Sequence, residues 1–306
     1  MQFRKSINAL RALAVLSVVL FHFKVPGFEG GFVGVDVFFV ISGFLMTGII
    51  VNGVQQQNFS LLGFYASRAR RIIPALLVLC VALLVFGYLY LPLDDLRETI
   101  RTIKSSLLFS SNFSFAQSGN YFAAPLHENW LLHTWSLSVE WQFYLLYPVL
   151  IMGLHRFFGA DKSRFALVAL ALMSLAASIV VTRLNPTFAF YMLPTRAWEM
   201  IAGGLVFLFP LRLGERGGVI CEGFGLLAIA VSVLGFSEAD LWPGYLALVP
   251  VLIALTIAVT PANVFMLQNA ADFPDVPYWA LIARLPLQVA LLALIAWCTR
   301  PNFAPR

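Results

Sequence analysis

Charged residues are scarce in this chain, and so are cysteines. Aspartate, glutamate, lysine and arginine make up 11% of its 306 residues, whereas soluble domains typically carry about 25%. The three cysteines each lie in an apolar run, and their spacing predicts neither a disulfide framework nor a metal site. The net charge of +5 is small for a nucleic-acid partner and fits basic residues in cytoplasmic loops better. The shortage of charge excludes an ordinary soluble domain.

Long apolar runs take the place of the missing charge, in a sequence that is 60% hydrophobic. Runs of about 20 apolar residues are long enough to cross a bilayer as helices, whereas a β-barrel would show alternating segments. We therefore predict an all-α fold, a polytopic transmembrane helical bundle over 1–262, followed by a divergent tail over 263–306. The predicted spans are 7–23, 31–51, 72–92, 135–155, 165–182, 196–211, 218–236 and 243–261, with a weaker ninth at 279–298.

The first apolar run lacks a clear small-residue cleavage site and a second span follows at once, so we expect an uncleaved first helix. The distribution of basic residues predicts a cytoplasmic N-terminus. Ten of them fall in the inner segments: Arg4, Lys5, Arg68, Arg70, Arg71, Arg156, Lys162, Arg164, Arg212 and Arg216. Five fall in the outer segments: Lys24, Arg97, Arg101, Lys104 and Arg183. This count requires that the polar segment 94–133 is an outer loop with an interfacial helix. If 99–115 crossed the membrane instead, every later loop would invert and the charge bias would worsen.

Three ionisable side chains lie inside the first two apolar runs. Arg11 and His22 are eleven residues apart, which is three helical turns, so they share a face and lie about 16 Å apart along the axis. The second run carries Asp36. Ionisable groups at membrane depth are costly and usually functional. We therefore treat all three as candidate functional residues.

His22 is a candidate general base, because imidazole titrates near neutral pH. Asp36 lies in the second span, across a short outer loop from His22. Its carboxylate could accept a hydrogen bond from the second imidazole nitrogen and so fix the tautomer. Two structural roles stay open, a histidine that hydrogen-bonds a neighbouring helix and an ion pair that packs two helices. His133, at the start of a later helix, is the main rival for the base.

A basic cluster, Arg68, Arg70 and Arg71, precedes the third span. Guanidinium groups suit phosphate recognition because they can donate two parallel hydrogen bonds. The alternative role is an anchor on the cytoplasmic side. The glycines of 30–34 are not a dinucleotide fingerprint, because no strand precedes them.

The predicted topology separates these groups by depth. Arg11 and the basic cluster fall on the inner side. The outer third of the helices holds His22, Asp36, Glu140, Arg196 and Glu199. Such an arrangement is typical of a protein that connects two compartments.

Several long motifs resemble the acyltransferase-3 family of integral membrane O-acyltransferases, of the O-antigen acetylase type. They are ALRALAV at 9–15, FH at 21–22, GFVGVDVFFVISGFL at 31–45, FYASRARRIIP at 64–74, HTWSLSVEWQFY at 133–144, TRAWEMIAGG at 195–204 and LWPGYLA at 241–247. The resemblance covers about residues 5–262 in order. The family's Arg and His, eleven positions apart, correspond to Arg11 and His22, and its cytoplasmic Arg-x-x-Arg corresponds to Arg68 and Arg71.

The family's tryptophan motif corresponds to Trp135, Ser136 and Glu140. The resemblance implies catalytic roles for His22, Asp36 and Glu140, with donor binding by Arg11, Arg68 and Arg71. We expect Trp135, Ser136 and Glu199 to line the acceptor pocket. The resemblance implies no metal and no bound cofactor.

The resemblance implies transfer of an acyl group, usually acetyl from cytoplasmic acetyl-CoA, to a hydroxyl of an envelope glycan such as O-antigen, exopolysaccharide or peptidoglycan. The expected location is the bacterial inner membrane, with no nucleic-acid partner. Many relatives of this subtype also carry an SGNH hydrolase-like domain, which this sequence lacks. We therefore expect a truncated member or a fragment, for which a separate SGNH-type protein is a candidate partner. The alternatives are a transporter or flippase of a lipid-linked sugar and an inactive remnant.

Overall fold

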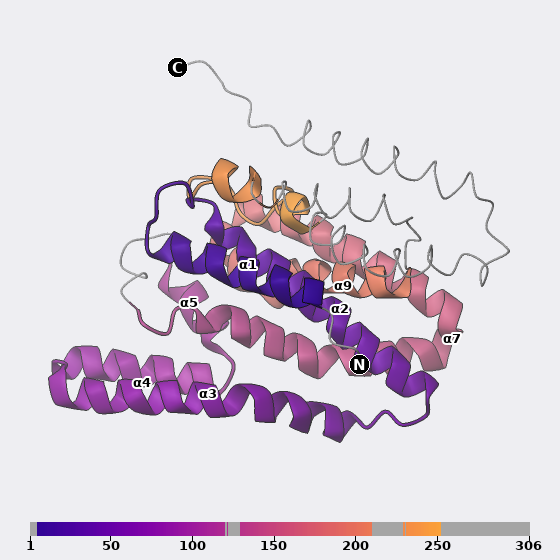
Figure 1. Ribbon diagram of the computed structural model, residues 1–306, viewed down its shortest axis with the longest axis horizontal. Coiled ribbons are helices and arrows are strands. Elements are labelled where there is room, and N and C mark those ends of the chain that lie inside the picture. The colour runs from indigo at the N-terminus through magenta and orange to yellow at the C-terminus, as the bar shows by residue number, and fades with distance from the viewer. Residues whose placement is uncertain (1–4, 120, 122–128, 210–228, 230, 252–306) are drawn as a thin grey trace, which may run out of the picture. The chain divides into compact units, whose positions relative to one another are not determined.

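A computed structural model describes residues 5–119, 121, 129–209, 229 and 231–251 of the chain. Every regular element within these ranges is a helix, which confirms the predicted all-α class (Figure 1). The chain divides into two compact units. Unit 1 comprises Met1–Thr47 and Glu199–Arg306, and unit 2 comprises Gly48–Trp198.

Unit 1 is built around α1 (Lys5–His22), the short η1 (Gly31–Val33), the first part of α2 (Gly34–Gln55) and the later part of α9 (Leu193–Leu208). One stripe of α1 is buried and consists of Ile7, Leu10, Ala14, Ser17 and Phe21. This spacing of three and four residues is the period of one helical face. The opposite face exposes apolar side chains, namely Leu13, Val15, Leu16 and Val19. Apolar exposure of this kind suits contact with lipid.

Four glycines let the helices of unit 1 approach one another closely. A Cβ on Gly31 or Gly34 would overlap the backbone carbonyl of Ser17 or Ala14, on α1. Two further glycines, Gly43 on α2 and Gly203 on α9, lie where these two helices cross. A Cβ on Gly43 would overlap the backbone of Met200, and one on Gly203 would overlap that of Val40. Lipid gives no hydrophobic drive for helices to associate, so such close contacts carry much of the packing.

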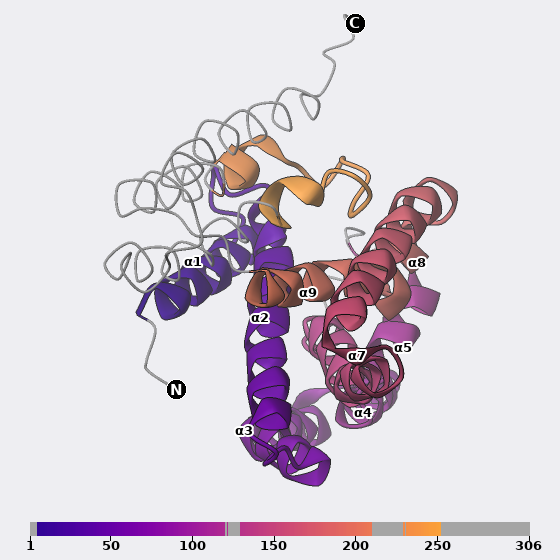
Figure 2. The same cartoon turned by 90° about the vertical axis from the view of Figure 1, so that its right-hand side faces the viewer.

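Unit 2 contains α3 (Leu61–Tyr90), α4 (Leu93–Leu107), α5 (Ser111–Ser118), α7 (Thr134–Leu184) and α8 (Pro186–Tyr191). Ser60 caps α3, because its hydroxyl accepts a hydrogen bond from the amide of Gly63. α7 is two helices that meet at Gly159, whose positive φ of 75° breaks the helical path. Figure 2 shows the two parts of α7.

The polar segment after α3 folds as the amphipathic helix α4 followed by α5. Thr102, Ile103 and Ser106 face inward from α4, and Ile103 packs in one cluster with Leu76 and Cys80 of α3. The chain leaves helical geometry between the two helices, where Phe109 has a φ of +52°. It therefore forms no continuous helix over 99–115, the alternative span that would have inverted the later loops.

Four described helices are long and apolar enough to cross a membrane: Gly31–Gln55, Leu61–Tyr90, Thr134–Gly159 and Lys162–Leu184. The shorter Ile7–His22 is also apolar. These five correspond to the first five predicted spans, and α9 corresponds to the sixth. The predicted spans 218–236 and 243–261 lie partly outside the described residues, and the tail 263–306 with its ninth span lies wholly outside them.

Alanine at either glycine of the α2–α9 crossing should destabilise the protein. Gly43→Ala and Gly203→Ala each add a methyl group where only backbone is present, and overpacking of this kind costs about 1–3 kcal/mol. Gly153→Ala, inside α7, is the matched control, since its Cβ would meet nothing within 4 Å. The measurement is the thermal unfolding midpoint of each variant in detergent. An unchanged midpoint in both crossing variants would show that the helices do not meet at these glycines.

Candidate active site

His22, the predicted base, is the last residue of α1 and is half-buried. Its ring stands edge-on to that of Phe21, with 4.9 Å between the centroids. Phe21 in turn belongs to the buried stripe of α1. The backbone that carries the imidazole is therefore held by packing, while the ring itself is partly open.

A chain of aromatic rings supports this end of α1. The ring of Phe32 lies 5.6 Å from Phe21 and 5.0 Å from Trp242, and Trp242 lies 5.2 Å from Phe236. The loop after α1 is also fixed through its backbone, because the amide of Gly30 donates to the carbonyl of Val233 over 2.9 Å. The sequence motifs include the segment around Trp242, but they gave no indication of its contact with Phe32.

Asp36 lies in the first turn of α2 and is fully buried. The N-terminal end of a helix carries partial positive charge, which favours a carboxylate there. Asp36 shares one face of α2 with Val40 and Gly43, since positions four and seven residues apart align on a helix. Because α1 and α2 run in opposite directions with a short loop between them, His22 and Asp36 lie at the same end of the two helices.

Arg11 lies three turns before His22 on α1 and is half-buried. Its guanidinium carbon is 5.3 Å from the ring centroid of Phe38 on α2, a favourable cation–π position. Its Nε is buried and donates no hydrogen bond within the described part of the chain. Glu199, the first residue of α9 that belongs to unit 1, is fully buried beside the α2 crossing.

The basic cluster lies on α3 in unit 2. Arg68 is half-buried, with its guanidinium carbon 5.8 Å from the ring centroid of Phe64, while Arg70 and Arg71 are exposed. Arg68 and Arg71 are three residues apart and so lie on neighbouring parts of one helix face. The hydroxyl of Tyr65 donates to the carbonyl of Leu145 over 2.8 Å, which fixes this end of α3 to α7.

The tryptophan motif opens α7, and its side chains point to different surroundings. Trp135 is only 2% exposed, with its ring 4.6 Å from Phe190 and 5.4 Å from Tyr191. Ser136 is half-buried and donates to the carbonyl of His133. Glu140, one turn further along α7, is buried and accepts a short hydrogen bond from the hydroxyl of Tyr144.

The cluster around Trp135 contains two polar residues that sequence reasoning left without a role. The guanidinium of Arg196 is 1% exposed and lies 5.9 Å from the ring of Trp135 and 5.7 Å from that of Phe190. Burial raises the pKa of the Tyr191 phenol, and the nearby Tyr121 raises it further, so this hydroxyl stays protonated. Tyr144 was missed as well, although its spacing of four residues from Glu140 was a usable signal.

The predicted residues are divided between the two units. Unit 1 carries His22, Asp36, Arg11 and Glu199, while unit 2 carries Arg68, Arg71, Trp135, Ser136 and Glu140. The rival base His133 lies exposed just before α7. Among the residues whose positions are described, no three His, Cys, Asp or Glu side chains gather as a metal site would require.

Three relatives resemble this chain over much of its length. A protein from Haemophilus influenzae whose function is uncharacterised is 33% identical over 70% of this chain and 90% of its own length. The O-acetyltransferase OatA of Staphylococcus aureus is 29% identical over 85% of this chain, and the peptidoglycan O-acetyltransferase OatA of Listeria monocytogenes is 32% identical over 68%. The matched region is 45% and 34% of these two OatA proteins, so the chain spans less than half of either. No solved structure gives a significant match.

A family profile matches almost the whole sequence. Its description is acyltransferase domain, and the match covers residues 4–303. The likeness therefore continues through the segment 263–303, for which the short motifs alone gave no counterpart. Together with the apolar helices, this match shows that the chain is a multi-pass membrane protein of the acyltransferase-3 family.

Proposed function

We propose that this protein transfers an acetyl group from cytoplasmic acetyl-CoA to a hydroxyl of a cell-envelope glycan on the outer side of the bacterial cytoplasmic membrane. Membership of an acyltransferase family supports the reaction class, and the names of two relatives, O-acetyltransferase and peptidoglycan O-acetyltransferase, support the acetyl group and the polymer. The observation that carries the proposal is His22, a half-buried imidazole at the end of an apolar helix that also carries Arg11.

In this proposal His22 acts as the general base. The ring accepts the proton of the acceptor hydroxyl as that oxygen attacks the acetyl carbonyl, the carbon–sulfur bond of the thioester breaks, and the departing thiolate takes up the proton. Asp36 orients the imidazole from the first turn of α2. The N-terminal end of a helix carries partial positive charge, which favours a carboxylate in its first turn and suits that role.

The arginines bind the donor. Arg68 and Arg71 offer two guanidinium forks to the phosphates of the nucleotide end, and their position near the start of α3 places them outside its apolar part. The buried Nε of Arg11 has no acceptor among the described residues, which suits it to an acyl carbonyl or a phosphate oxygen. Glu140, Glu199 and the residues around Trp135 shape the acceptor side.

Replacing His22 by alanine should abolish acetyl transfer and leave the protein folded in the membrane. Loss of a general base typically lowers the rate by about 10²–10⁴. The measurement is transfer of label from radioactive acetyl-CoA to a soluble glycan, at equal expression. His133→Ala is the matched control and should keep activity. Normal turnover in the His22 variant together with loss in the His133 variant would reassign the base to His133.

The double variant Arg68→Ala/Arg71→Ala should raise the KM for acetyl-CoA and leave the KM for the glycan unchanged. Phosphate binding depends on the guanidinium fork, so lysine at both positions should rescue the donor KM only in part. Arg70→Ala, on the neighbouring position of the same helix, is the control. A donor KM equal to that of the unmodified protein would limit the two arginines to anchoring the helix.

The orientation of the chain can be tested with one cysteine. Ser118, exposed at the end of α5, is replaced by cysteine in a protein whose three native cysteines are removed. We expect a membrane-impermeant thiol reagent to label it in intact spheroplasts, because 94–133 should lie outside and the N-terminus inside. Labelling only after lysis would put the loop in the cytoplasm and contradict an outer acceptor site on this part of unit 2.

A further inference from the structure

A pocket that no motif singled out lies in unit 2 between the end of α3, one face of α4 and the turn before α7. Its volume is about 260 Å³. The lining residues are Leu83, Leu91, Asp95, Glu98, Thr99, Thr102, Asn129, Trp130 and Leu131. Pockets for drug-sized ligands usually measure about 300–1,000 Å³. This one is therefore of a size for a single small ring or one unit of a polymer.

The polar side of the pocket comes from α4. Asp95, Glu98, Thr99 and Thr102 lie at intervals of three and four residues, which places them on one face of the helix. Neither the Asp95 nor the Glu98 carboxylate forms an ion pair or hydrogen bond within the described residues. The nearest basic side chain along the helix, Arg97, pairs instead with Asp94, at 3.1 Å. The two pocket carboxylates therefore keep their acceptor oxygens available.

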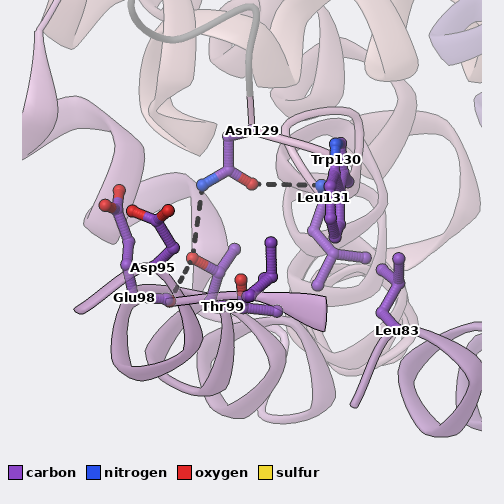
Figure 3. Close-up of a pocket in the computed structure, with 9 residues that line it drawn as sticks. Leu83, Asp95, Glu98, Thr99, Asn129, Trp130 and Leu131 are labelled. Atoms are coloured by element: carbon purple, nitrogen blue, oxygen red, sulfur yellow. Dashed lines mark hydrogen bonds between the residues drawn. The ribbon is translucent and has the colours of Figure 1, made fainter. Parts of the chain in front are cut away.

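The opposite side is aromatic. Figure 3 shows the indole of Trp130 across the pocket from Asp95 and Glu98. Trp130 is 49% exposed, yet its ring is supported edge-on by Phe86, with 5.4 Å between the centroids. Two aliphatic side chains, Leu83 and Leu131, extend the apolar surface. The indole is thus a supported flat surface with one face accessible.

Asn129 holds the two sides together. Its amide nitrogen donates to the hydroxyl of Thr102 over 3.3 Å, and its carbonyl oxygen accepts from the amide of Leu131 over 3.0 Å (Figure 3). The hydroxyl of Thr102 donates in turn to the carbonyl of Glu98 over 3.0 Å. This relay ties the turn that carries Trp130 to the face of α4 that carries the carboxylates. These hydrogen bonds therefore fix the spacing between the aromatic side and the acidic side of the pocket.

We propose that this pocket, which we call the α4 pocket, binds one uncharged sugar unit of the glycan acceptor. A pyranose ring has an apolar face of C–H groups and a rim of hydroxyl donors, which match an open indole face opposite unpaired carboxylates. The two negative charges disfavour an anionic sugar such as a uronate. This inference rests on the proposed function for the identity of the ligand as acceptor, but binding itself can be tested without any transfer reaction.

The test uses the full chain in detergent and isothermal titration calorimetry with two probes, chitotetraose, which is neutral, and tetragalacturonate, which is anionic. We expect chitotetraose to bind and tetragalacturonate not to. Glu98→Gln removes a charged acceptor and should weaken chitotetraose binding about tenfold, the typical effect of one such hydrogen bond. Trp130→Ala should weaken it by at least as much, whereas Trp130→Phe should retain most of it.

Matched controls lie next to the pocket. Asp94→Asn changes a carboxylate on α4 that faces Arg97, and Tyr88→Ala removes an aromatic side chain on α3 that is 78% exposed and does not line the pocket. Both should bind chitotetraose as the unmodified protein does. Equal losses in controls and pocket variants would overturn the inference. So would equal binding of both probes, or calcium binding that Glu98→Gln abolishes with no binding of chitotetraose.

A second measurement separates this inference from the proposed function. If acetyl transfer occurs, Trp130→Ala should raise the KM for chitotetraose without changing the KM for acetyl-CoA. Transfer with an unchanged glycan KM in that variant would overturn the α4 pocket and leave the transferase function in place. Binding that depends on Trp130 in a protein that transfers no acetyl group would support the pocket and contradict the function. Should Trp130→Ala fail to fold, Glu98→Gln decides the test, because Glu98 is an exposed residue of α4.

Discussion

The arrangement of unit 1 depends on contact between helix backbones at glycine. Two helices in lipid gain no hydrophobic free energy when their apolar side chains move from lipid into a helix contact. Their association therefore depends on van der Waals contact at short range. Gly31 and Gly34 provide that contact between α1 and the start of α2, and Gly43 and Gly203 provide it between α2 and α9. These contacts lie in the same helices as Asp36 and Glu199.

This packing also shows how acidic groups can be buried in so apolar a chain. Asp36 and Glu199 are both fully buried, a placement that is costly unless the surroundings supply compensating polarity. The first turn of α2 supplies part of it for Asp36 through the partial positive charge of a helix end. His22 differs, because it is only half-buried. Asp36 lies two residues after Gly34, and Glu199 directly precedes Met200, which contacts Gly43. The close helix contacts and the buried carboxylates therefore lie in the same short segments.

Much of the fold could be predicted from hydropathy, because apolar runs of about 20 residues are typical of helices that cross a membrane. The residues at which helices begin and end were harder to predict. The third span was predicted at 72–92, but α3 already begins at Leu61, since the capped and partly polar segment 61–71 continues the same helix. A helix after α3 was expected from its charge pattern and is present as α4, although hydropathy gave no indication that it would form a pocket with Trp130.

The candidate site was predictable where chemistry is tied to spacing along one helix. Arg11 and His22 do lie three turns apart on α1, and Arg68 and Arg71 do share a face of α3. Contacts between distant segments could not be predicted, because they depend on tertiary packing. Three contacts are examples: Arg196 lies over Trp135, Trp242 packs against Phe32, and Asn129 bridges Thr102 and Leu131. The functional roles of these residues remain predictions, and sequence alone assigns them only through the family.

The central claim is that this protein moves an acetyl group across a membrane to a glycan. The most direct measurement encloses acetyl-CoA labelled in its acetyl group inside proteoliposomes that contain the purified chain, with an uncharged oligosaccharide outside. We predict alkali-labile label on the external oligosaccharide, formed at the rate at which enclosed acetyl-CoA is consumed and absent from vesicles without protein. Passage of an intact labelled sugar lipid across the same vesicles, with no consumption of acetyl-CoA, would contradict the account and identify a transporter.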